Sequence, residues 1–127
     1  MRIPWRVHIG TICIIPVYNS QVDWHWHNEF EIVAVSEGVV DCHVGQESFR
    51  LKAGEAVFIN SRVLHQFTAK DYGIMPNIVF SPEFIAPEQT VIYDKFIAPI
   101  EKSTMAVVKI LCIPFTRSYI IFLFVRR

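Results

Sequence analysis

The residues from Val39 to Lys52 alternate between apolar and polar side chains on both sides of a Gly45-Gln46 pair. This period of two is typical of half-buried β-strands, and a glycine at the first position of a two-residue loop suits a type II′ turn. The segment therefore predicts a β-hairpin in which Val44 faces Glu47. The same register pairs Cys42 with Phe49 and Val40 with Leu51 on one face, and Asp41 with Arg50 on the other.

Short apolar runs between turn signals recur along the rest of the chain, which favours an all-β sandwich or barrel. We expect further strands at about Val7–Val17 with a break near Gly10, Asp23–His27, Phe30–Glu37, Ala56–Ile59, Val63–Thr68 and Ile74–Phe80. Helical signals come late in the chain. Ser81 precedes a proline and an acidic residue, which predicts a short helix ending before Pro87. A second short helix over Gln89–Ile97 should stop at Pro99.

The chain has 127 residues, which suffices for one domain with a single core. Twelve basic residues balance twelve acidic ones, and only 19% of the residues are charged. This composition offers no cationic surface for a phosphate backbone, so we expect no direct contact with DNA. The chain also lacks the pattern of a signal peptide.

The cysteines indicate the redox environment of the protein, and the apolar C-terminal stretch raises the question of membrane association. Cys13, Cys42 and Cys112 are odd in number and form no CxxC pair, which indicates a reducing cytoplasm and no disulfide framework. The stretch from Met105 to Val125 is almost long enough to span a membrane. Its two charged residues and its proline, Lys109, Arg117 and Pro114, argue against that, so we expect no membrane association.

The segment from Trp24 to Glu31 carries a dense group of residues that can bind a metal. Alternate residues of a strand share a face, so His25 and His27 point together and away from Trp24 and Trp26. A turn after His27 would bring Glu31 beside the two imidazoles. Two imidazoles and one carboxylate suit Zn(II), Mn(II), Fe(II) or Ni(II), and His65 is a fourth candidate ligand.

A plain structural role for this segment is the alternative. Large aromatic side chains favour the interior, so Trp24 and Trp26 could fill the core and leave both histidines in solvent. Glu31 argues for the metal site, because its neighbours Ile32 and Val33 are apolar and the strand is thus expected to be covered on both faces. A buried carboxylate needs a partner.

These residues resemble the two motifs of the cupin superfamily. The first motif is matched by His25, His27, Glu31 and Gly38, and the second by Gly54-Glu55, Ile59 and His65. The match is closest to the effector-binding domains of AraC-type transcriptional regulators. That branch is indicated by Glu31-Ile32-Val33, Leu51-Lys52-Ala53-Gly54-Glu55, Ile59-Asn60, the run from Ile78 to Phe84 and the run from Asp94 to Ile100. The sequence departs from the usual cupin motifs at Asn19, at Asn60-Ser61-Arg62 and at Ala69.

The resemblance implies a cupin-like double-stranded β-barrel, or jelly roll, with one or two short C-terminal helices. It also implies a small organic effector in the barrel, in contact with His25, His27, Glu31, Val33 and His65. A divalent ion on His25, His27, Glu31 and His65 is a further possibility, and the domain would act as a homodimer in the cytoplasm.

The end of the chain departs from that family. We expect a sensor domain over residues 1–104 and an atypical apolar tail over residues 105–127, with no helix-turn-helix domain for DNA. The chain is then a truncated or separated sensor. Two alternatives remain open at this point: a small metal-dependent cupin enzyme of the dioxygenase or isomerase type, and a domain that folds but senses nothing.

Overall fold

The computed structural model describes residues 11–17, 21–69, 71–114 and 120–124. Within these residues ten strands account for most of the regular structure, which confirms the all-β prediction. The strands are β1 (Thr11–Val17), β2 (Gln21–His25), β3 (Phe30–Ala34), β4 (Glu37–Val44), β5 (Glu47–Lys52), β6 (Ala56–Ile59), β7 (His65–Thr68), β8 (Gly73–Phe80), β9 (Val107–Pro114) and β10 (Ile120–Phe124).

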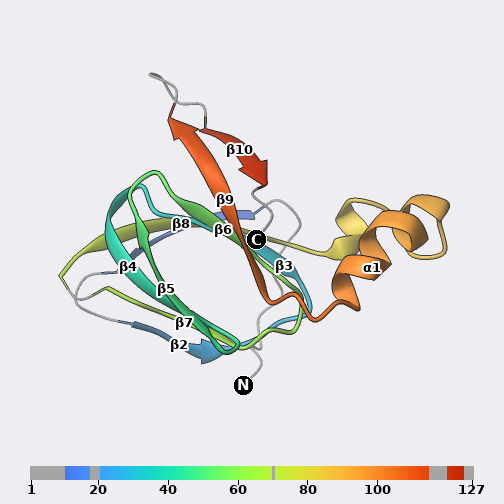
Figure 1. Cartoon of the computed structure of the whole chain (residues 1–127), viewed down its shortest axis with the longest axis horizontal. Helices are drawn as coiled ribbons and strands as arrows, with labels where there is room; N and C mark the ends of the chain where they lie inside the picture. The colour runs from blue at the N-terminus through green and yellow to red at the C-terminus, as the bar shows by residue number, and fades with distance from the viewer. Residues whose placement is uncertain (1–10, 18–20, 70, 115–119, 125–127) are drawn as a thin grey trace.

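The strands form two antiparallel sheets that curve around a shared interior (Figure 1). One sheet has the order β10-β9-β6-β3-β8-β1, and the other has the order β5-β4-β7-β2. The first two residues of β4, Glu37 and Gly38, pair with Ile74 and Gly73 of β8 and so join the sheets along one edge. Inward-facing side chains of both sheets therefore meet in one barrel interior.

The β4–β5 hairpin has the predicted register throughout. Val44 faces Glu47, Cys42 faces Phe49 and Val40 faces Leu51. Gly45 has a φ of 59°, as the first central position of a type II′ turn requires. On the outer face, Arg50 Nε donates to Asp41 Oδ1 at 2.7 Å.

The strand at Ala56–Ile59 lies where it was predicted, whereas several other boundaries differ. β2 ends at His25 and not at His27, because its partner β7 begins at His65, the residue opposite His25. β7 begins at His65, two residues later than expected. The part of the first predicted strand before Thr11 lies outside the described residues.

The single strand expected over Phe30–Glu37 is divided into β3 and the start of β4. Between them, the backbone N–H of Val35 donates to the carbonyl of Glu55 at 3.0 Å, and that of Ser36 donates to the carbonyl of Ile74 at 2.9 Å. The chain then turns at Gly38, whose φ of 76° is strained for any residue with a Cβ. This turn passes the chain from one sheet to the other.

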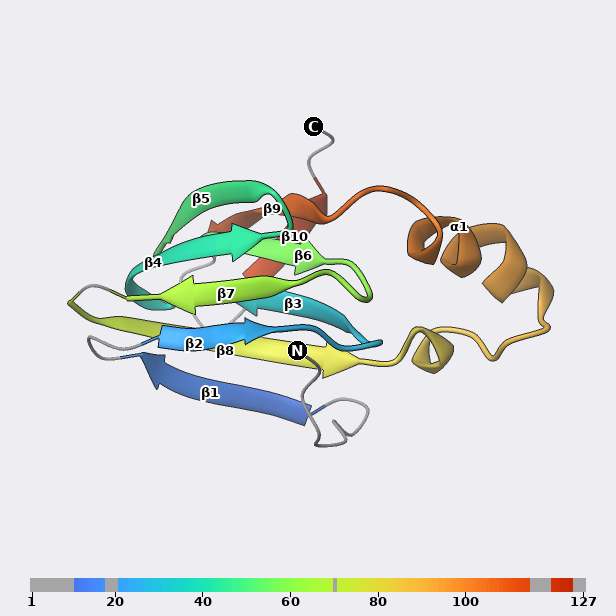
Figure 2. The same ribbon diagram turned by 90° about the horizontal axis from the view of Figure 1, so that it is seen from below.

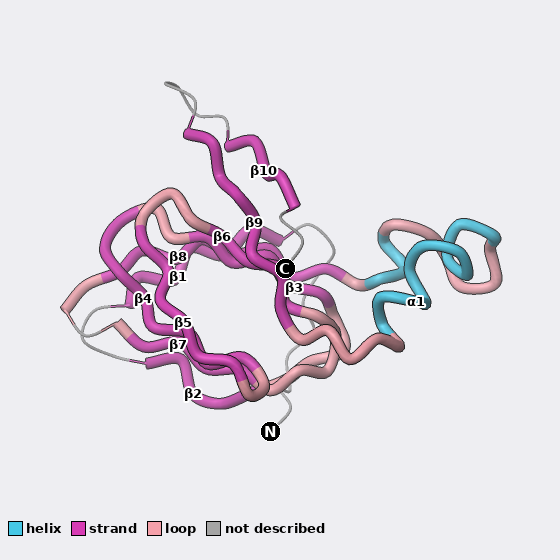
Figure 3. The backbone as a smooth tube through the Cα atoms, viewed as in Figure 1, coloured by secondary structure: helices cyan, strands magenta, loops and turns pink. Residues whose placement is uncertain are grey.

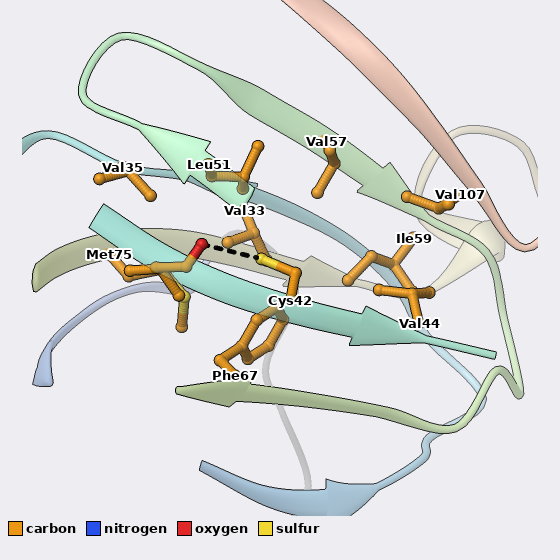
Figure 4. Close-up of a cluster of buried hydrophobic side chains, with 11 residues drawn as sticks. Val33, Val35, Cys42, Val44, Leu51, Val57, Ile59, Phe67, Met75 and Val107 are labelled. Atoms are coloured by element: carbon orange, nitrogen blue, oxygen red, sulfur yellow. Dashed lines mark hydrogen bonds between the residues drawn. The ribbon is translucent and has the colours of Figure 1, made fainter. Parts of the chain in front are cut away.

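The barrel interior is filled by a cluster of apolar side chains from both sheets (Figure 4). Its buried members are Val33, Val35, Val40, Cys42, Val44, Leu51, Val57, Ile59, Phe67, Met75 and Val107. Full burial of each larger side chain stabilises the fold by about 1.5–3 kcal/mol. A polar group among them must find a partner in the barrel.

The helical residues follow β8 and lie together on one side of the barrel (Figures 2 and 3). They form a 3₁₀ turn, η1 (Pro82–Phe84), a π-helical turn, η2 (Tyr93–Ile97), and a short helix, α1 (Ala98–Glu101). Ser81 caps η1 as predicted, since its Oγ accepts a hydrogen bond from the N–H of Glu83 at 3.2 Å.

The expectation that Pro99 stops the second helix is wrong. The helical segment continues through Pro99 to Glu101. Pro99 falls in the first turn of α1, directly after the π-helical turn, where a residue without an N–H is tolerated.

The strand β9 follows the helical segment and joins the first sheet. It pairs with β6, so that Ala56 faces Ile110 and Ile59 faces Val107. Val107 and Ile110 are buried in the core. The domain boundary expected between residues 104 and 105 stays a prediction.

Candidate functional site

The three histidines of the predicted site come from two neighbouring strands. His25 ends β2 and lies opposite His65, the first residue of β7, while His27 follows two residues after β2. Their rings are close: the ring centroids lie 4.2 Å apart for His25 and His65, 5.1 Å for His27 and His65, and 5.8 Å for His25 and His27. All three are buried.

The Nδ1 atom of each ring is held by a backbone carbonyl two residues away in the chain. The pairs are His25 with Asp23 at 2.7 Å, His27 with Glu29 at 3.1 Å, and His65 with Val63 at 2.7 Å. A carbonyl oxygen can only accept a hydrogen bond, so each Nδ1 carries a hydrogen. In the neutral ring, Nε2 then keeps its lone pair, which is the form that binds a metal ion.

Glu31 of β3 lies against this group of rings. Its Oε2 atom is 3.2 Å from Nε2 of His27 and 3.0 Å from Nε2 of His65. Burial alone would raise the pKa of the Glu31 carboxyl, but its contacts with His27 and His65 outweigh burial and hold the pKa well below its usual range. Glu31 is therefore a buried carboxylate that carries its charge at neutral pH.

The pKa values of His25 and His27 are shifted in opposite directions. Burial, together with the nearby His65, lowers the pKa of His25. Burial also acts to lower the pKa of His27, but the contact with Glu31 outweighs it and the pKa is raised. Since Nδ1 already carries a hydrogen, the short contact between His27 Nε2 and Glu31 Oε2 needs a positive charge between them. A proton on Nε2 or a bound metal ion supplies it.

The four residues fit a divalent metal ion. One ligand atom from each of His25, His27, Glu31 and His65 lies within 4.8 Å of the others, and all four side chains are buried. Nε2 of His65 is buried and forms no hydrogen bond within the described part of the chain, although it lies 3.0 Å from Oε2 of Glu31. Three imidazoles and one carboxylate form a set of ligands that suits Zn(II), Mn(II), Fe(II) or Ni(II).

The apolar surroundings place this group inside the barrel. Val33, two residues after Glu31 on β3, is fully buried in the core cluster, and the ring of Phe67 lies 5.5 Å from that of His65. Trp24 is 39% exposed and Trp26 is only partly buried. The alternative in which the indoles fill the core and the histidines face solvent is therefore wrong.

Sequence reasoning missed Asn77, which binds Glu31 from the neighbouring strand. Asn77 lies on β8, and its Nδ2 donates to Oε1 of Glu31 at 2.8 Å. The sequence did contain a signal for this contact, because Asn77 is a polar residue at one of the inward-facing positions of an apolar strand. Met75, Asn77 and Val79 alternate with more exposed residues, so this asparagine had to face the interior.

Comparison with known proteins identifies the family. The profile described as "AraC-like ligand binding domain" matches residues 8–74, just over half of the chain. The chain belongs to this family. A curated relative, the uncharacterized HTH-type transcriptional regulator YdeC of Bacillus subtilis, is 27% identical over 88 residues. The alignment covers 68% of this chain and 30% of the length of YdeC.

Solved structures agree with this assignment at the level of the fold. A conserved protein of unknown function from Streptococcus pyogenes superposes with a TM-score of 0.57 at 18% identity, over 61% of this chain and 69% of its own. A cupin-2 domain protein of Shewanella frigidimarina gives a TM-score of 0.50 at 25% identity, over 61% and 78%. The AraC-like domain thus has the predicted cupin-type double-stranded β-barrel.

Among the described residues, no helix has the length and the apolar character needed to cross a lipid bilayer.

Proposed function

We propose that this AraC-like domain senses a small organic effector that binds inside the barrel beside His25, His27, Glu31, Val33 and His65. The observation that carries the proposal is the convergence of four buried ligand-type side chains in the core of a domain of this family. A buried charge such as that of Glu31 costs stability unless it is compensated. Buried charged groups of this kind are typical of binding sites.

We further propose that His25, His27, Glu31 and His65 hold a divalent transition metal ion. When bound, such an ion supplies a Lewis-acidic centre that coordinates an oxygen or nitrogen atom of the effector. The carbonyls bonded to the three Nδ1 atoms orient the rings. The negative charge of Glu31 would offset part of the double positive charge of the ion. Val33 supplies an apolar wall that keeps bulk water out.

The signal would be a change in the arrangement of a homodimer in the cytoplasm. An effector transmits information only if its affinity differs between two arrangements of the protein. Contact with DNA would be made by a helix-turn-helix domain and not by the residues of this barrel. The similarity to the HTH-type regulator YdeC supports this division of labour.

The experiment measures metal content and ligand response in the same preparations. The chain is purified without added metal and analysed for Zn, Mn, Fe and Ni, and its melting temperature is then recorded with each metal and with a library of small molecules. We expect about one ion per chain, its loss in His25→Ala, and a rise in melting temperature with a subset of ligands. An unchanged melting temperature across the whole library would contradict effector sensing.

The chain offers a matched control in His43. This histidine lies on the outer face of β4, where its Nδ1 is bonded to Ser48 Oγ at 2.9 Å, and it is not part of the cluster. His43→Ala should keep both metal and ligand response. Loss of metal in both variants would indicate that the ion binds elsewhere.

A metal-dependent enzyme is the second candidate, because an octahedral ion such as Fe(II) or Mn(II) held by these four ligands would keep two coordination positions for a substrate. The two functions differ in turnover. A sensor returns its ligand unchanged, whereas a dioxygenase consumes oxygen and an isomerase changes the ligand. Incubation of the iron- or manganese-loaded chain with each ligand that raises the melting temperature, followed by mass spectrometry and oxygen measurement, separates them.

A further inference from the structure

Asn77 carries a buried polar atom that none of the contacts described so far employs. The residue lies on β8, directly opposite Val33 of β3, and is only 8% exposed. Its Nδ2 donates to Oε1 of Glu31, while its Oδ1 is buried and has no hydrogen-bond partner within the described part of the chain. Leaving such an acceptor unpaired costs about 1–3 kcal/mol.

The chemistry of Glu31 fixes the orientation of the Asn77 amide. A charged carboxylate can only accept hydrogen bonds, so it must face the NH₂ group of the amide and not its oxygen. Rotating the amide by half a turn would place two acceptors against each other. Oδ1 is therefore the atom that Asn77 offers to something other than Glu31.

Among the side chains that the structure describes, the neighbours of this oxygen supply no hydrogen for it. Val33 and Met75 are apolar, and the Nδ1 hydrogens of the three histidines are already bonded to backbone carbonyls. The Nε2 atoms of His27 and His65 face the Glu31 carboxylate, and the oxygens of that carboxylate can only accept. The described side chains therefore leave this acceptor open to a donor on a molecule bound in the barrel.

We propose that Asn77 Oδ1 is a specificity-determining contact, which accepts a hydrogen bond from a hydroxyl group of the effector. This inference rests on the proposed function, and it deepens it by naming the class of ligand: a small hydroxylated molecule whose O–H reaches β8 while the rest of its polar atoms face the histidines and Glu31. A water molecule in the barrel offers the same O–H chemistry, and the experiment separates the two sources.

The first arm uses crystal structures of the wild-type chain after chelation, with zinc alone, and with zinc and glycolate. With zinc alone, or after chelation, we expect a water oxygen at hydrogen-bond distance from Asn77 Oδ1. With glycolate, we expect its hydroxyl oxygen there in place of the water. An Oδ1 that has no oxygen within hydrogen-bond distance in any of these structures, or that is paired with a protein donor, would overturn the proposal.

The second arm measures the contribution of the hydroxyl hydrogen in solution. Methoxyacetate keeps the oxygens of glycolate but replaces the hydroxyl hydrogen with a methyl group. The zinc-loaded wild-type chain should bind glycolate at least about fivefold more tightly than methoxyacetate. In Asn77→Leu this preference should disappear, whereas in Gln46→Leu, which alters an exposed amide in the hairpin turn, it should remain. A preference that persists in Asn77→Leu would show that the methyl group merely fails to fit.

These outcomes distinguish the inference from the proposed function. A chain that responds to no small molecule contradicts effector sensing and, with it, the role of Asn77 in specificity, even where a water lies on Oδ1. A chain that responds to ligands irrespective of their hydroxyl groups, with Oδ1 unbonded, supports effector sensing and contradicts the role of Asn77. The crystal structures need only the wild-type chain, so a poorly folded Asn77 variant does not block the test.

Discussion

Asn60 donates its side-chain amide to the backbone carbonyl of Ile100 at 2.8 Å, across forty residues of sequence. The second hydrogen of the same amide is bonded to the carbonyl of Met105, also at 2.8 Å. Asn60 thus ties the loop after β6 to the end of α1 and to the start of β9. Two residues later, the N–H of Arg62 donates to the carbonyl of His27 at 2.8 Å. One short loop therefore contacts both the candidate site and the helical segment.

Replacing the buried Asn60 with leucine should destabilise the fold by about 1–3 kcal/mol, because two partly buried carbonyls lose their donor. The free energy of unfolding in urea measures the effect. Gln46→Leu is the control, since Gln46 is exposed and its replacement should cost less than about 0.5 kcal/mol. Equal stabilities for the two variants would show that water can replace the Asn60 amide.

Two glycines with positive φ provide a matched pair for backbone substitution. Gly38 has a φ of 76°, and a Cβ added there would lie 2.2 Å from the carbonyl oxygen of Tyr72. Gly54 has a φ of 89°, but a Cβ added there meets nothing within 4 Å. Gly54→Ala should cost about 1–2 kcal/mol from backbone strain alone. Gly38→Ala should cost about 2–5 kcal/mol, because the steric clash adds to the strain.

Thermal or urea unfolding of both glycine variants checks this difference. The larger loss of stability in Gly38→Ala should come with faster amide hydrogen exchange in β4 and β8, which pair at this point. A Gly38→Ala variant no less stable than Gly54→Ala would mean that the two strands separate easily here and that their junction contributes little.

Local patterns were sufficient to predict the parts of the fold in which one interaction dominates. The hairpin register followed from the position of Gly45 and the alternation around it, because a shift by one residue would turn every side chain to the opposite face. The association of His25, His27 and Glu31 followed from strand periodicity and from the cost of burying a carboxylate. His65 and the barrel itself were recognised through the resemblance to cupin motifs.

Other features depend on contacts between distant segments and were not predictable. β2 ends at His25 because its partner β7 begins at His65, and no local residue signals this. Pro99 is tolerated because a π-helical turn precedes it, which depends on how the segment packs. The alternation along β8 could have predicted that Asn77 faces the interior, but its contact with Glu31 arises only when β8 lies beside β3.

Cys42 should react slowly with thiol reagents in the folded protein. Its side chain is fully buried, and burial, with the nearby Asp41 and Glu31 charges, raises its pKa to about 12. Only the thiolate is nucleophilic, so both access and ionisation are restricted. In a variant with Cys13→Ser and Cys112→Ser, we expect modification by an aromatic disulfide reagent at pH 8 to be at least about 100-fold slower than in urea.

The same thiol gives a prediction for alkaline stability. The folded pKa lies above the unfolded value of 9.0, so the stability associated with Cys42 is fully present below pH 9 and is lost as the pH rises towards 12. Cys42→Val should reduce the slope of unfolding free energy against pH in that range. Rapid modification at pH 8 without denaturant would contradict both predictions, since it would mean that β4 opens readily.

The ion pair between Glu55 and Lys109 should make the attachment of β9 sensitive to acid. Lys109 Nζ lies 2.9 Å from Glu55 Oε2, and the other oxygen of Glu55 accepts the backbone N–H of Lys52 at 2.8 Å. The lysine lowers the pKa of the Glu55 carboxyl, and the bond from Lys52 acts in the same direction, against partial burial. The charged form of Glu55 therefore favours the folded state.

Because the folded pKa of Glu55 is below its unfolded value of 4.5, this stabilisation is present above pH 4.5 and is lost as the pH falls through the folded pKa. Glu55→Gln should lower the stability at pH 7 by about 0.2–1 kcal/mol, a typical range for an ion pair near the surface. The difference between the variant and the wild type should be smaller at pH 3 than at pH 7. Urea unfolding at both pH values measures the difference. Glu37→Gln, which replaces an exposed carboxylate at the start of β4, should not show this convergence. If Glu55→Gln remains less stable than the wild type by the same amount at pH 3, the loss comes from the packing of the side chain and not from its charge.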